Sequence, residues 1–194
     1  MGKLRFINGC SKSVSLVQEF EDMGWDAWTC DLQPSEGWPK HIQDDILKHL
    51  DDGWDFGIFH QDCTYLANSG VRWRVERQEW DEIREAAEFF NKVDAAKFPH
   101  VSENPIHHKY ARLYIRKYDQ LIQPWQFGSL ETKAICLWFT GNIPSLVPTY
   151  PYKPDNLKQS TWREPPGANR KANRARNFPE VSKEMAKQWG MEKK

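Results

Sequence analysis

The sequence predicts an α/β fold built on a doubly wound, mainly parallel sheet of the Rossmann-like type. Short apolar runs alternate along the chain with segments in which apolar residues recur at helical spacing. The connections between them are short, and strands that alternate with helices in this way form βαβ units. The chain has 194 residues, of which 39% are hydrophobic, which suffices for one hydrophobic core.

The first part of the chain contains two predicted strands around one helix. Residues 4–7 form a short apolar run that ends in the turn-type sequence NGCS at 8–11. Apolar residues then follow helical spacing over 14–23, which predicts a helix with one buried face. A second strand is expected over 27–30.

The same alternation continues to residue 141. We expect a short helical segment over 41–50, a strand over 56–59, a long helix over 79–97, a strand over 98–101, a short helix over 111–118 and a strand over 135–139. The long helix is the clearest, because one face is lined by Trp80, Ile83, Ala87, Phe90 and Val93.

The chain divides into a Rossmann-like domain over 1–150 and an arm over 151–194. The arm is rich in Pro and Arg, and we expect it to pack on the domain and to end in a short helix near 181–189. Residues 153–194 carry eleven Lys and Arg against five Asp and Glu, a net charge of +6, although the whole chain is formally neutral. Such an arm can contact phosphates, and a solvated basic tail is the alternative.

The four cysteines are widely spaced, which favours free thiols in a reducing compartment. They form no ligand pattern with the histidines, so we expect no metal site; the histidines weighed as ligands are His60, His100, His107 and His108. The N-terminus lacks a signal-peptide core, and no apolar run is long enough to span a membrane. We therefore expect a soluble, cytoplasmic protein.

Cys63 and Glu103 each follow a predicted strand. Ligands of open parallel sheets bind beyond the carboxyl ends of the strands, so both residues are expected at one crevice. Cysteine is the most nucleophilic side chain near neutral pH. A nearby glutamate can act as a general acid or hold a ring nitrogen. The alternatives are a buried structural cysteine and a surface glutamate.

The turn after the first strand is where a doubly wound fold binds a nucleotide-like ligand. Gly9 permits close approach of a ligand, and the following helix offers free amide groups. Asp31, after the second strand, can accept ribose hydroxyls, and Asp45 with Ile46 can bind the amine of adenine. A plain turn, a solvated Asp31 and a helix cap at Asp45 are the alternatives.

The order of these features resembles that of cytosine-5 DNA methyltransferases. The stretches that carry the resemblance are FINGCSKSV, Asp31, IQDDI, HQDCTYLANSG, SENP and QFGSLETKAICLWFTG. The chain is similar, more closely, to small phage-encoded proteins labelled as DNA cytosine methyltransferases, which carry stretches like HIQDD, CTYLANSGVRW, ENP, QPWQFG, ETKA and a final FP…A..W segment. The resemblance extends from Phe6 to Trp189.

The resemblance implies S-adenosylmethionine as the methyl donor. Its methionine and ribose side would be lined by Phe6, Asn8, Gly9 and Ser11. Asp31 would hold the ribose, and Asp45 and Ile46 the adenine. The implied location is the cytoplasm of a bacterial host.

The resemblance also implies the chemistry of the substrate side. Cys63 would attack carbon six of a pyrimidine, and Glu103 would hold or protonate the ring nitrogen. Lys133 is the nearest match to a basic residue of the family. Substrate contacts are expected from Thr64, Asn68 and Asn104. The substrate would be DNA, RNA or a nucleotide, and a homodimer is a further expectation.

Two features depart from the family pattern. Asp62 precedes the cysteine where proline is expected, and a neighbouring carboxylate raises the pKa of a thiol. The segment that reads DNA sequence in larger members has no counterpart here. Two other functions therefore stay open: a nucleotide hydrolase or glycosyl-transfer enzyme that uses Glu103 or Asp62, and a catalytically inactive phage accessory protein that binds cofactor, nucleotide or a host protein.

Overall fold

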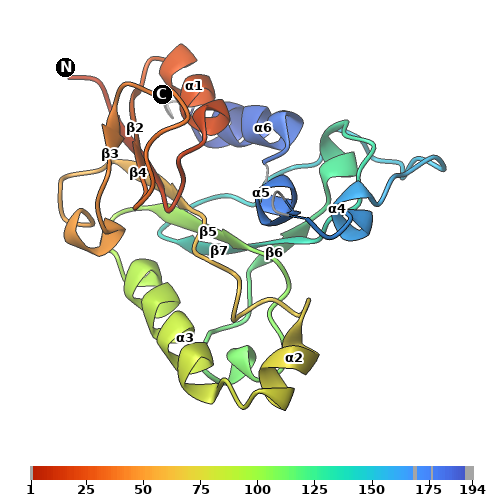
Figure 1. Ribbon diagram of the computed structural model, residues 1–194. Coiled ribbons are helices and arrows are strands. Elements are labelled where there is room, and N and C mark those ends of the chain that lie inside the picture. The colour runs from red at the N-terminus through yellow and green to blue at the C-terminus, as the bar shows by residue number, and fades with distance from the viewer. Residues whose placement is uncertain (1, 168–169, 176, 191–194) are drawn as a thin grey trace.

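The computed structural model describes residues 2–167, 170–175 and 177–190, which form an α/β structure (Figure 1). The strands are β1 (Arg5–Gly9), β2 (Asp26–Cys30), β3 (His41–Ile42), β4 (Phe56–Phe59), β5 (His100–Asn104), β6 (Gln120–Ile122) and β7 (Ile135–Thr140). The α-helices are α1 (Val14–Asp22), α2 (Val71–Glu76), α3 (Trp80–Asp94), α4 (Ser160–Arg163), α5 (Arg170–Ala175) and α6 (Pro179–Trp189). The 3-10 helices are η1 (Ile46–Lys48), η2 (Ala111–Leu113) and η3 (Pro124–Phe127).

All seven strands form one sheet in the order β3-β2-β1-β4-β5-β7-β6. The first five strands are parallel, and β7 runs antiparallel to both β5 and β6. The order β3-β2-β1-β4-β5 is that of a Rossmann-type sheet, which confirms the predicted fold class. Strands are added toward one edge of the sheet up to β3, and toward the other edge from β4 onward, so the strand order reverses between β1 and β4. Sheets of this type bind ligands in a crevice at the carboxyl ends of the strands at that point.

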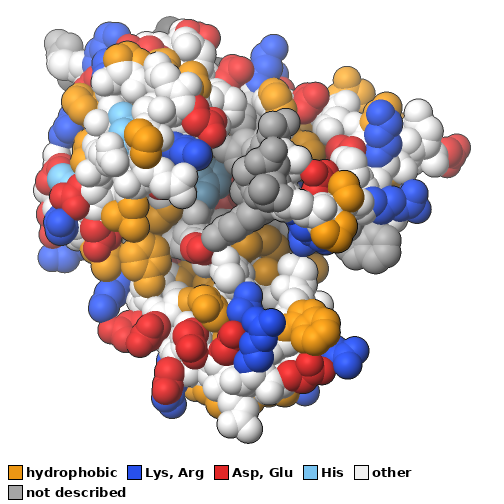
Figure 2. Space-filling view, in the orientation of Figure 1, with side chains coloured by type: hydrophobic (Ala, Val, Ile, Leu, Met, Phe, Trp, Pro, Cys, Tyr) orange, Lys and Arg blue, Asp and Glu red, His pale blue; other side chains and the backbone are white. Residues whose placement is uncertain are grey.

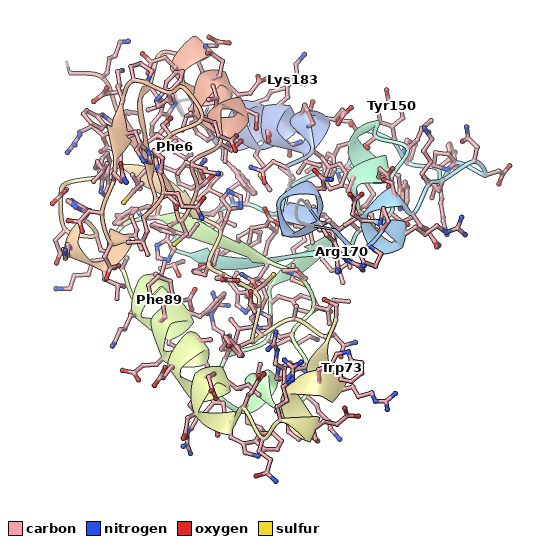
Figure 3. All side chains as sticks on the ribbon, in the orientation of Figure 1. Phe6, Trp73, Phe89, Tyr150, Arg170 and Lys183 are labelled. Carbon is pink, nitrogen blue, oxygen red and sulfur yellow. The ribbon has the colours of Figure 1, made fainter. Side chains whose placement is uncertain are left out.

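Helices α1 and α6 cover one face of the sheet (Figure 1). Phe6 of β1 stacks on Phe20 of α1 with ring centroids 3.7 Å apart, and Val181 and Met185 of α6 belong to the same buried cluster. The indole nitrogen of Trp25 donates to the carbonyl of Gly190 at 2.8 Å. The last described residues are therefore tied to the segment between α1 and β2, and Figure 3 shows Phe6 in this region of the sheet.

Helix α3 covers the opposite face. Its buried residues are Ile83, Ala87, Phe90 and Val93, four of the five positions expected from the periodicity, while Trp80 is partly exposed. Phe90 contacts Trp138 of β7, with ring centroids 5.1 Å apart. None of the helices in the described ranges has the length and apolar character needed to cross a membrane.

Two local expectations differ from the structure, and one strand is not expected from the sequence. The predicted helix over 41–50 is instead the short strand β3 followed by η1, because the Asp45 carboxylate accepts from the amide of Leu47 and begins a new turn there. The predicted helix over 111–118 is only the 3-10 helix η2. Strand β6, with three residues, is too short for its period to be read from sequence.

Candidate functional site

His60 and Glu103 meet at the carboxyl ends of β4 and β5. The parallel register pairs Phe59 with Ser102, so the next residue of each strand also lies side by side. His60 Nδ1 lies 2.8 Å from Glu103 Oε2, and the two side chains are only 16% and 14% exposed. The amide of His60 also donates to the carbonyl of Gly9 at 3.0 Å, which ties this pair to the end of β1.

The Glu103 carboxyl is held in its ionised form. Burial disfavours the charge, but the hydrogen bond from His60 and the electrostatic attraction of His60 and Lys133 outweigh it, so the pKa of Glu103 is lowered. An ionised carboxylate only accepts hydrogen bonds. Nδ1 of His60 must therefore carry the proton in this contact.

Lys133 is the third charged residue of this site. Its Nζ donates to the backbone carbonyl of Arg174 at 3.1 Å and lies 5.5 Å from the ring centroid of Phe178. Arg174 and Phe178 belong to the arm, so the arm reaches the end of the sheet at which Glu103 lies. A cavity of about 10 Å³ lies here, lined by Leu16, His60, Glu103, Lys133, Ile135, Asn177, Phe178, Val181, Ser182 and Met185. That volume holds about one water molecule.

Cys63 lies in the loop after β4, within electrostatic range of Glu103 and Lys133. Burial raises the pKa of its thiol, the Asp62 and Glu103 carboxylates raise it further, and the Lys133 ammonium opposes them. Cys63 is thus close enough to both Glu103 and Lys133 to feel their charges. The three residues expected to be catalytic converge electrostatically, although they come from separate segments.

Two contacts hold the Cys63 loop against β5. Gln61 donates from Nε2 to Ser102 Oγ at 2.7 Å, and Asn104 donates from Nδ2 to the carbonyl of Gln61 at 2.8 Å. The Asn104 side chain is buried, with its Oδ1 3.2 Å from His107 Nε2. Asn104 therefore positions the cysteine loop, and a substrate contact from it stays a prediction.

The Asp62 carboxylate points into its own loop. Its Oδ1 accepts from the amide of Thr64 at 2.9 Å and from the Thr64 hydroxyl at 2.5 Å. This arrangement is an Asx turn, in which a short acidic side chain closes the backbone two residues on. The turn starts the chain reversal at Cys63, whose carbonyl accepts from Leu66 and Ala67. Asn68, also expected at the substrate, is exposed beside this loop.

The residues expected to bind cofactor surround the ends of β1 and β2. The pKa of the Cys10 thiol is raised by burial first, then by Asp31, Cys30, Asp45 and Asp62. Asp31 and Asp45 are thus both near the turn after β1. Ile46 packs into the core beside them, and Ser11 is buried, with its amide bound to the Cys30 carbonyl. Phe6 is a fully buried core residue.

Asn8 is fully buried on the face of β1 that carries Phe6. Neither its Nδ2 nor its Oδ1 has a hydrogen-bond partner among residues 2–167, 170–175 and 177–190. A buried amide without partners is rare in folded proteins. Asn8 therefore offers a donor and an acceptor to a ligand at this edge.

Gly9 lacks a side chain because of packing. A Cβ at this position would lie 2.3 Å from Cδ1 of Phe59 and 3.1 Å from Cγ1 of Ile46. The left-handed backbone of the turn falls on the next residue, Cys10, with φ of 54°. A contact between Gly9 and a ligand stays a prediction. In the structure, it is the ring of Phe59 that packs against Gly9 where a side chain would lie.

Gly9→Ala is expected to lower the free energy of unfolding by about 1–3 kcal/mol, because the added methyl overpacks the Phe59 ring. Urea denaturation measures it. Gly2→Ala is the control, since nothing lies within 4 Å of its Cβ position, and its effect should stay within about 0.5 kcal/mol. Equal stability of Gly9→Ala and the wild-type protein would contradict the packing explanation.

His60 is the residue of this site that the sequence analysis missed, because it was weighed only as a metal ligand. His60 is the first polar residue after the apolar strand β4. Glu103 stands at the corresponding position of β5, directly after Ser102. Pairing the two strand ends by register would have found it. Comparison with protein-family models and with curated proteins gives no match for this chain.

Proposed function

We propose that the protein is an S-adenosylmethionine-dependent methyltransferase that acts on a pyrimidine ring in nucleic acid or a nucleotide. The observation that carries the proposal is that Cys63, in the loop after β4, lies within electrostatic range of both Glu103 and Lys133, near the carboxyl ends of β4 and β5. A nucleophile, a carboxylate and a cation beside a Rossmann-type switch point are what ring activation requires.

The sheet gives further support. An antiparallel strand, β7, stands beside β5 on an otherwise parallel sheet. The sequence predicts a Rossmann-like, mainly parallel sheet, and the observed sheet is mainly parallel. Since a fold hosts many chemistries, this support is secondary to the site.

Each residue has a role that follows from its surroundings. Cys63 would add through Sγ to carbon six of the pyrimidine, with the Lys133 ammonium stabilising the thiolate. The ionised Glu103 would accept a hydrogen bond from the exocyclic amine or a protonated ring nitrogen. Both interactions raise the electron density at carbon five.

Asn8 is the residue whose surroundings best fit the methyl donor. The donor would supply an electrophilic methyl group, and its polar groups could pair with the two buried amide atoms that lack partners among the described residues. An unpaired buried polar group costs about 1–3 kcal/mol, which such pairing would recover. Asp31 and Asp45 would hold its ribose and adenine.

Asn8→Ala is expected to weaken cofactor binding about tenfold or more, because 1.4 kcal/mol corresponds to a factor of ten in affinity. The free energy of unfolding without ligand should not fall, because the substitution removes a buried amide that has no partner among the described residues. Calorimetric titration with S-adenosylmethionine, beside urea denaturation, measures both. Unchanged affinity would remove Asn8 from the binding site.

The transfer of tritiated methyl groups tests the proposed function. The full chain is incubated with labelled S-adenosylmethionine and, in parallel, with cytosine-containing DNA, RNA and cytidine nucleotides. Incorporation into one class, at carbon five, is expected. Cofactor binding without transfer to any class would contradict the enzyme and favour the second candidate, a binding protein without catalysis, which the raised pKa of the Cys63 thiol supports.

A further inference from the structure

We propose that His60 is the base that removes the proton from carbon five of the pyrimidine, with Glu103 holding its imidazole in position. The inference rests on the proposed function and assigns a residue to the step that completes it. A pyrimidine that gains a methyl group at carbon five must lose the proton already there. The step needs a proton acceptor close to the ring.

The contact between His60 and Glu103 determines which ring nitrogen can accept a proton. Nδ1 donates to Glu103 Oε2 at 2.8 Å, so in the neutral imidazole the lone pair is on Nε2. Nε2 is closed off from solvent and has no partner within the described part of the chain. His60 also lines the small cavity between the sheet, α1 and α6, which has room for about one water molecule, so the pyrimidine ring would reach Nε2 only after arm side chains that line the cavity, such as Phe178, have moved aside.

The other charged groups of the cavity are poorer acceptors. The Lys133 ammonium has no lone pair, and its Nζ is already a donor to Arg174. The ionised Glu103 is held by its hydrogen bond to His60, which lowers its pKa and makes it a weak base. The Nε2 lone pair of His60, in contrast, is engaged by no hydrogen bond among the described residues.

The step balances without another reactant. Cys63 Sγ bonds to carbon six, and the electron pair released at carbon five forms the bond to the methyl group, whose sulfonium carrier leaves as a neutral thioether. His60 Nε2 then takes the proton of carbon five. The pair of that C–H bond re-forms the double bond to carbon six, and the S–C bond breaks with its pair returning to sulfur. The imidazolium, stabilised 2.8 Å away by Glu103, later releases its proton to water.

The decisive variant is His60→Asn, with His60→Gln as the second. The amide of asparagine can still donate to Glu103 but cannot accept a proton as a base. His49→Gln is the matched control, because His49 Nδ1 also lies 2.8 Å from a carboxylate, that of Asp52, but His49 does not line the cavity. Each full-length protein is mixed with labelled S-adenosylmethionine and the substrate class that the wild-type protein methylates.

Turnover of both His60 variants should fall about 100-fold or more, the usual contribution of a general base. Methyl transfer itself should still occur once per protein. The label should therefore accumulate as a protein–substrate complex that survives a denaturing gel, because elimination of Cys63 needs the lost proton. The wild-type protein and His49→Gln should show little of this complex.

Two outcomes would overturn the inference in distinguishable ways. Turnover of a folded His60 variant close to that of the wild-type protein, or a fall without the complex, removes His60 from the step and leaves the methyltransferase intact. No transfer by the wild-type protein rejects the proposed function and the role of His60 with it. Thermal unfolding shows which variants are folded. One folded variant, either His60→Asn or His60→Gln, is sufficient for the test.

Discussion

Cys63→Ala is expected to lower methyl transfer by at least about 1,000-fold, because the proposed covalent addition to the ring is made by its thiol. Burial raises the pKa of the three other thiols as well, that of Cys30 and of Cys136 to about 12, which disfavours their thiolates. Steady-state transfer from labelled S-adenosylmethionine measures the effect. The same variant should form no covalent complex with a 5-fluorocytosine substrate.

Cys136→Ala is the control for the loss of a thiol. Its side chain is buried in the cluster that also contains Phe90 of α3, so the variant loses some stability but should keep its activity at a temperature where it is folded. Methyl transfer by Cys63→Ala at the wild-type rate would sink covalent catalysis by this residue. Loss of activity in both variants would point to a general effect of the substitutions on the fold.

Trp138→Ala is expected to cost about 3–5 kcal/mol in the free energy of unfolding, the range for truncating a buried aromatic side chain. Trp138 is 1% exposed and stacks on His107 with ring centroids 4.7 Å apart, and its indole nitrogen donates to the carbonyl of Arg116. Truncation removes these contacts and leaves a cavity under α3. Urea denaturation followed by circular dichroism gives the value.

Trp73→Ala is the matched control. Trp73 projects from α2, where it is 55% exposed (Figure 3), so its truncation should change the free energy of unfolding by no more than about 0.5 kcal/mol. A comparable loss in both variants would contradict the assignment of Trp138 to the core. The pair separates buried from exposed tryptophans in a chain that has ten.

The charge distribution bears on the substrate. Acidic and basic side chains are interspersed over the α2 and α3 part of the surface in Figure 2. Arg72 of α2, for example, is paired with Glu76, and Arg74 with Glu79. Tight binding of a duplex requires many unpaired cations along one face. The α2 and α3 part of the surface does not offer such a face.

Local patterns in the sequence predicted most of the elements, because strand and helix periodicity depends only on neighbouring residues. The helix α3 and the strands β1, β2, β4, β5 and β7 lie where periodicity placed them, within a few residues at the ends. The two-residue β3 and three-residue β6 could not be found in this way. They exist because a neighbouring strand supplies their hydrogen bonds.

The sequence by itself determined the fold class and placed Cys63 and Glu103 at the ends of strands. Only the tertiary structure decided which side chains meet there, because that depends on the register between strands far apart in the chain. The register of β4 and β5 sets His60 against Glu103. The packing of the arm brings the Arg174 carbonyl to Lys133. The Phe59 ring, rather than a ligand, accounts for the glycine at position 9.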